Sequence, residues 1–107
     1  MRYSVGTSNP EMGVWDPKIE TYWMKQTLTA FYGRCVVEAD ADTYWHEKSQ
    51  DYKSPVLENP SWKKLFGIAK KQQQKTRDFH HSFFEGYWDT GKDDETGARI
   101  LRLSLGS

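Results

Sequence analysis

The sequence predicts an α+β fold: an antiparallel sheet of four to five strands, built from two β-hairpins, with one or two helices packed on one face. Three observations predict this fold class. Residues 62–77 have apolar positions at helical spacing. Residues 79–105 alternate with the period of a strand on either side of a polar loop. Ten of the sixteen aromatic residues form adjacent pairs, and neighbours in a strand point to opposite faces of a sheet.

The composition indicates a single small folded domain, residues 1–107. The net charge is zero and only 36% of the residues are hydrophobic, so large aromatic side chains must supply much of the core. Disorder is not expected, because disordered chains have few aromatic residues and a high net charge. The single cysteine, Cys35, excludes an internal disulfide, and we expect it to be a small buried hydrophobic residue.

No segment has the pattern of a signal peptide or of a membrane span. The first six residues lack an apolar signal region, and no apolar run approaches the roughly 20 residues of a transmembrane helix. We therefore expect a cytoplasmic protein that does not contact a membrane.

The N-terminal part predicts a short strand, a loop and the start of a helix. Residues 2–6 form the strand, and residues 7–15 have the composition of a loop. Asp16 and Pro17 mark a helix start, because aspartate caps free N–H groups and proline fits the first turn. If this helix ran on to Tyr32, its apolar residues would not form one stripe.

Residues 25–42 allow two interpretations. A two-residue turn at Gly33-Arg34 makes them a β-hairpin, with apolar residues on one face and polar residues on the other. In the alternative, a helix ends at Gly33 as its C-cap and a strand follows. The clean separation of apolar from polar positions favours the hairpin.

The polar residues 46–58 predict an exposed loop, and the clearest helix follows it. Asn59 is the expected N-cap and Pro60 the first helical residue. Gly67 lies inside the helix, where glycine costs about 1 kcal/mol relative to alanine, and we expect it to mark a close approach to a neighbouring element. The face expected to pack on the sheet comprises Trp62, Leu65, Phe66, Ala69 and Gln73.

The C-terminal part predicts the second hairpin. Residues 79–88 and 98–105 alternate in character, and the polar residues 89–97 connect them. In the last strand Ile100, Arg102 and Ser104 share one face. The opposite face carries Leu101, Leu103 and Leu105.

No common catalytic or cofactor motif is present, so the sequence favours a protein that is not an enzyme, has no catalytic residues and uses no cofactor. A glycine-rich phosphate loop, Gly-x-Ser-x-Gly and His-Glu-x-x-His are all absent. Glu38, Asp40 and Asp42 would share one strand face at intervals of about 7 Å. That interval is too wide for one ion, so we expect a solvated face and no metal site.

The leading hypothesis is a small accessory protein that acts by protein–protein contact or self-association. Helices cover only one face of the predicted sheet, and aromatic rings on the other face would form a patch of the kind that binds a protein partner or a second copy. We expect the contact residues on the second hairpin: Phe84, Tyr87, Trp88 and Arg102.

Two alternatives remain open. Nucleic-acid binding is one, because residues 62–77 carry six cations and no acid. The other is a cup-shaped fold with an aromatic-lined pocket for a small molecule or a reaction, using Tyr44, His81 and Glu85 as polar groups. The cations of the first alternative are Lys63, Lys64, Lys70, Lys71, Lys75 and Arg77.

Overall fold

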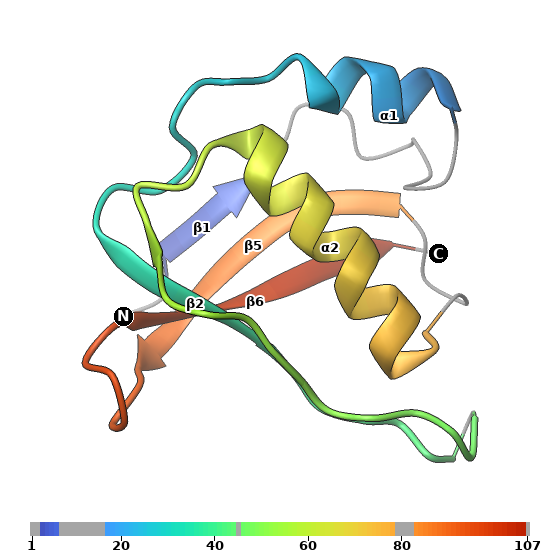
Figure 1. The fold of residues 1–107 in the computed structure, drawn as a ribbon. Helices are drawn as coiled ribbons and strands as arrows, with labels where there is room; N and C mark the ends of the chain where they lie inside the picture. Colours follow the sequence, from blue (N-terminus) through green and yellow to red (C-terminus); the bar gives the residue numbers. More distant parts are fainter. Residues whose placement is uncertain (1–2, 7–16, 45, 79–82, 107) are drawn as a thin grey trace.

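The computed structural model describes residues 3–6, 17–44, 46–78 and 83–106, which form two layers (Figure 1). One layer consists of the helices α1 (Pro17–Met24) and α2 (Trp62–Thr76), both on the same face of a sheet. The strands are β1 (Tyr3–Gly6), β2 (Arg34–Ala39), β3 (Tyr52–Lys53), β4 (Leu57–Glu58), β5 (Phe83–Lys92) and β6 (Arg99–Gly106). The predicted α+β class, with helices on one face of a sheet, is confirmed.

The sheet is mixed, because one of its strand pairs is parallel. The order is β1-β5-β6-β2, and β3 and β4 follow each other along the outer edge of β2. β5 and β6 form the predicted second hairpin. β6 runs parallel to β2, with Val36 opposite Ile100 and Val37 opposite Leu101. These two strands are far apart in the sequence, so no local turn indicates their relative direction.

The predicted first hairpin, centred on Gly33, is wrong. α1 ends at Met24, residues 25–33 form no strand, and β2 pairs with β6, β3 and β4 instead. The cause is a contact from a distant segment. The Gly33 N–H donates to Asn59 Oδ1 at 2.7 Å, and the Asn59 N–H donates to the Gly33 carbonyl at 2.8 Å. These two hydrogen bonds hold Gly33 against Asn59, so the chain does not form the two-residue turn at Gly33-Arg34 that the hairpin requires.

α2 begins slightly later than the sequence predicts. Its N-cap is Ser61, whose hydroxyl accepts a hydrogen bond from the Lys64 N–H at 3.1 Å. Asn59, the expected cap, instead has a left-handed φ of 46° and binds Gly33. The expected inner face is confirmed, because its central residues are fully buried: Leu65, Phe66, Ala69 and Gln73.

The core between the layers is a cluster of aromatic and aliphatic side chains. The Phe84 ring centroid lies 5.1 Å from that of Trp23 and 5.5 Å from that of Phe66. The Tyr87 hydroxyl donates to the Leu65 carbonyl at 2.6 Å, which connects β5 to α2. Apolar burial therefore holds the helices to the sheet, and the hydrogen bond from Tyr87 adds a buried polar contact between the two layers.

The predicted polar loop 89–97 is shorter than expected. β5 continues to Lys92, and the connection closes where the Asp93 N–H donates to the Ala98 carbonyl at 2.7 Å. Asp89 is buried within the strand, and Arg99 donates to its carboxylate from the Nε and NH2 atoms at 2.8 to 3.0 Å. A charged residue therefore belongs to the sheet here because its ion-pair partner lies on the adjacent strand.

Candidate functional site

The second hairpin does not present the aromatic patch predicted for it. Phe84 is 0% exposed and Tyr87 is 1% exposed, so these two predicted contact residues are wrong. The register of β5 shifts between Phe84 and Gly86, which places both rings on the core face although they are three residues apart. Trp88 and Arg102 are cross-strand neighbours on the opposite face, where Trp88 is 40% exposed.

The sheet face opposite the helices is dominated by charges that neutralise one another. Arg102 lies 3.4 Å from Asp40 and 3.9 Å from Glu38, and Lys53 lies 3.5 Å from Glu38. Two of the three carboxylates considered above thus face cations from neighbouring strands. No group of three metal-binding side chains occurs within the part of the chain that the structure describes. This face therefore has the character of a solvated charged layer around one exposed tryptophan.

Tyr44 and Glu85, the two described residues of the predicted cup, do not come together. Tyr44 is 87% exposed in the loop after β2. Glu85 accepts a hydrogen bond at 3.0 Å from the Ser104 hydroxyl, on the sheet face away from the helices. His81 lies outside the described residues. The predicted pocket of Tyr44 and Glu85 is therefore wrong, because packed rings fill the space between the two layers.

The cations predicted on residues 62–77 have separate surroundings. Lys70 pairs with Glu20 of α1 at 2.6 Å and so connects the two helices. The other five border two hollows on the outer side of α2. Lys63, Lys64 and Lys71 line the first hollow, and Lys75 and Arg77 line the second.

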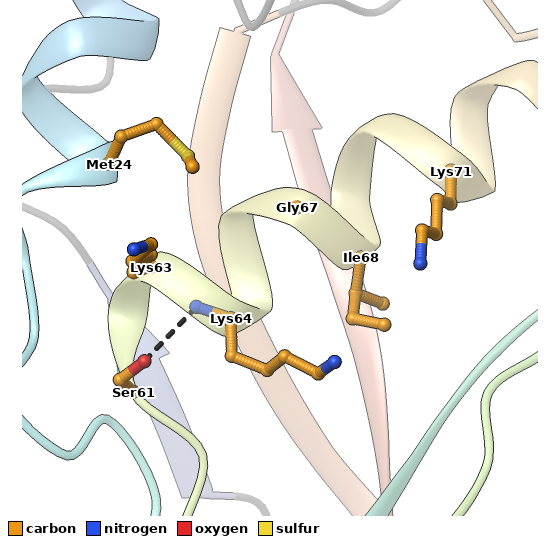
Figure 2. A pocket seen from close by; sticks show the side chains of 7 residues that line it. All are labelled: Met24, Ser61, Lys63, Lys64, Gly67, Ile68 and Lys71. Carbon is orange, nitrogen blue, oxygen red and sulfur yellow. Dashed lines mark hydrogen bonds between the residues drawn. The ribbon is translucent and has the colours of Figure 1, made fainter.

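The first hollow is a groove of about 380 Å³ between the end of α1 and the outer side of α2. Figure 2 shows the Met24 side chain extending from the end of α1 toward α2, with the side chains of Lys64 and Lys71 on either side of Ile68. We call this hollow the α2 groove. It is lined by Met24, Ser61, Lys63, Lys64, Gly67, Ile68 and Lys71.

Gly67 leaves the floor of the α2 groove without a side chain at that position. A Cβ atom built on Gly67 would meet nothing within 4 Å outside its own stretch of helix. The expected close approach of another element to Gly67 is therefore wrong, and the position faces open space. Met24 adds an apolar wall that is 44% exposed. The groove thus combines an apolar floor with three lysines, and no acidic residue lines it.

The second hollow, of about 320 Å³, lies at the C-terminal end of α2, and we call it the C-terminal hollow. The Gln50 N–H donates to the Lys75 carbonyl at 3.1 Å, and the Ser49 hydroxyl donates to the Thr76 carbonyl. These bonds fasten the loop before β3 to the helix and bring Lys48 beside the helical cations. The lining residues are Lys48, Gln50, Gln74, Lys75 and Arg77.

Sequence reasoning identified the groove's lysines but not its floor. Gly67 follows Lys63 and Lys64 by four and three residues and precedes Lys71 by four. Residues at these spacings share one side of a helix, so the sequence itself places Gly67 on the cationic side. The part played by Met24 carries no such signal, because it depends on how α1 lies against α2.

No protein family model matches this chain, and no curated protein or solved structure matches it. Among the described residues, no helix is long and apolar enough to cross a membrane.

Proposed function

We propose that this protein is a non-enzymatic interaction protein that binds a partner protein through the α2 groove. The observation that supports this function is the position of Gly67. Glycine inside a helix costs about 1 kcal/mol relative to alanine, and close packing commonly explains its presence. Here nothing outside the helix's own stretch around Gly67 comes within 4 Å of the Cβ position. A gap that the chain does not fill itself suits a side chain or backbone from a partner.

The rest of the α2 groove supports the same function. Methionine is flexible and polarizable, and surfaces that adapt to protein partners are rich in it. Met24 is partly exposed here, and the exposed side chains of Lys63, Lys64 and Lys71 surround the floor. An apolar centre within a polar rim is the usual arrangement of a protein–protein interface.

This proposal keeps protein contact as the function but moves it from the hairpin to the helical layer. Burial of Phe84 and Tyr87 removes the aromatic platform on which the hairpin hypothesis depended. Trp88 and Arg102 stay accessible on the opposite face of the sheet. They are candidates for a second contact, with another protein or with a second copy of the chain.

Photo-crosslinking from defined positions tests the proposed function. A photoreactive amino acid replaces Lys71 in the α2 groove or, as a matched control, Asp94 in the turn between β5 and β6; both side chains are exposed. In source cells we expect a discrete protein adduct from position 71 only, which survives nuclease digestion. Equal adducts from both positions, or an adduct that nuclease removes, would contradict protein binding at the groove.

Nucleic-acid binding is the second candidate function. It is supported by the sequence of α2, which has no acid, and by the exposure of five cations along its outer side. Phosphate contacts predict an affinity that falls steeply between about 50 and 200 mM salt. Fluorescence anisotropy with a labelled single-stranded oligonucleotide measures this dependence. Absent binding, or binding that salt does not weaken, would exclude this function.

A further inference from the structure

We infer that the occupant of the α2 groove is an acidic amphipathic helix of a partner protein, lying along α2 from the groove to the C-terminal hollow. This inference rests on the proposed protein-binding function and adds the chemistry and the position of the bound segment.

The charges on the outer side of α2 favour an acidic occupant. Lys64, Lys71 and Lys75 are seven and four residues apart, so they align along the helix. Glu20 pairs with Lys70, and neither hollow has an acidic residue in its lining. Neighbouring cations repel one another, and carboxylates of a partner would relieve that repulsion and fix the register of binding.

The two hollows follow each other along α2, and the proposed binding strip runs from one to the other. Lys71 lines the α2 groove and Lys75 lines the C-terminal hollow, and these two residues are one helical turn apart. At the helical rise of about 1.5 Å per residue, the distance from Lys64 to Arg77 is roughly 20 Å. A helix of about 13 residues spans that distance. Lys48, held at the end of α2 by its loop, extends the cationic surface there.

The apolar residues of the strip favour an amphipathic helix over a polyanion such as nucleic acid as the bound partner. Gly67 lets a second helix approach α2 closely, because helices pack by fitting ridges into grooves. Met24, which lines the groove beside it, is 44% exposed. A helix with one apolar stripe and an acidic flank would use both the floor and the lysines. A phosphate backbone would leave the apolar floor without a contact.

A second copy of this chain does not supply such a helix from its described elements. α1 has the sequence PKIETYWM, with Glu20 as its acid, and α2 contains no acidic residue. Within the described residues, therefore, no helix of a second copy fits the groove as well as a helix of a different protein would.

Binding of designed peptides tests this inference by fluorescence anisotropy on the full chain. Three helical peptides share one length: an apolar stripe flanked by glutamates, the same stripe flanked by lysines, and glutamates around a serine stripe. We expect the first to bind at least tenfold more tightly than the other two and than a labelled single-stranded oligonucleotide. Lys64→Glu should weaken its binding at least tenfold, whereas Lys92→Glu, at the exposed last residue of β5, should change it less than twofold.

A double variant, Lys48→Gln with Arg77→Gln, separates the two ends of the strip. We expect it to weaken the glutamate peptide by a smaller factor, about two to fivefold, because the apolar contact at Gly67 is retained. No effect would confine the occupant to the α2 groove and overturn the continuous strip. Circular dichroism of each variant confirms that the fold is retained.

The outcomes separate this inference from the proposed function. Equal or tighter binding of the lysine peptide, the serine-stripe peptide or the oligonucleotide would overturn the acidic amphipathic helix. If no peptide binds while the protein crosslink from position 71 persists, the inference is wrong and protein binding at the groove stands. If the crosslink is also absent, both are wrong.

Discussion

The inner side of α2, which faces the sheet, is tightly packed, whereas its outer side is open. On the inner side Leu65, Phe66 and Ala69 are fully buried and pack against the rings of α1 and the sheet. On the outer side, three lysines surround Gly67, which leaves a groove of about 380 Å³. The inner side is packed with buried side chains, whereas the outer side lacks a side chain at Gly67 that would stabilise the helix. The proposed function accounts for this difference, because a partner would occupy the space that the outer side leaves open.

Truncation on the inner side should give the largest loss of stability. Phe66→Ala removes a ring whose centroid lies 5.5 Å from that of Phe84 and 6.1 Å from that of Trp23. We expect the free energy of unfolding to fall by about 3–5 kcal/mol. Urea denaturation measures the change, and Lys71→Ala is the matched outer-side variant, with an expected effect within about 0.5 kcal/mol. Similar losses for both variants would mean that the two sides do not differ.

Loss of one hydrogen bond between β5 and the inner side of α2 should lower the stability by less than the loss of the Phe66 ring. Tyr87→Phe removes the donor to the Leu65 carbonyl without emptying the site. The expected loss is about 1 kcal/mol, the typical net contribution of such a bond. Tyr32→Phe is the control, because Tyr32 is largely exposed. An unchanged urea midpoint for Tyr87→Phe would show that this hydrogen bond contributes nothing to stability.

Addition of a methyl group on the outer side should stabilise the protein. Gly67→Ala improves the helix propensity by about 0.8–1.0 kcal/mol, and the added Cβ atom meets nothing within 4 Å outside its own stretch of helix. For a chain of this size the melting temperature should rise by roughly 4–8 °C per kcal/mol. A thermal melt followed by circular dichroism measures it. A lower melting temperature would reveal an internal contact at Gly67 and remove the argument for a partner.

The core that faces α2 also predicts a small dependence of stability on pH. Burial raises the pKa of the Cys35 thiol from 9.0 to about 11, so the thiol ionises first in the unfolded chain. Stability from this group is complete below pH 9 and is lost as the pH rises toward 11. Urea midpoints at pH 8 and 9.5 should differ more for the wild type than for Cys35→Ala, by up to about 1 kcal/mol. Identical pH dependence in both would contradict burial of the thiol.

Sequence patterns predicted the elements whose causes are local. The inner face of α2 follows from apolar spacing, and the second hairpin follows from alternation on both sides of a polar segment. The first hairpin was wrong because Asn59, a distant residue, binds Gly33. The parallel pairing of β2 with β6 depends on the tertiary fold and has no local signature.

Some features of the candidate site could likewise be predicted from the sequence, and others could not. The lysines of α2 and the place of Gly67 among them can be read from helical spacing. The burial of both Phe84 and Tyr87 could not be predicted from the sequence, because a shift in strand register changes the simple alternation of faces. The position of Met24 at the groove could not be predicted either. It depends on how α1 lies against α2, which the Glu20–Lys70 ion pair and the ring packing of Trp23 determine.

The most direct test of partner binding in the α2 groove replaces Gly67 with side chains of increasing size and measures the photo-crosslink from position 71. The series is glycine, Gly67→Ala and Gly67→Leu, with the free energy of unfolding measured for each protein. We predict that both variants are at least as stable as the wild type, while the yield of the protein adduct falls with side-chain size and is lost for leucine. A stable Gly67→Leu protein that crosslinks as efficiently as the wild type would contradict partner binding in the α2 groove.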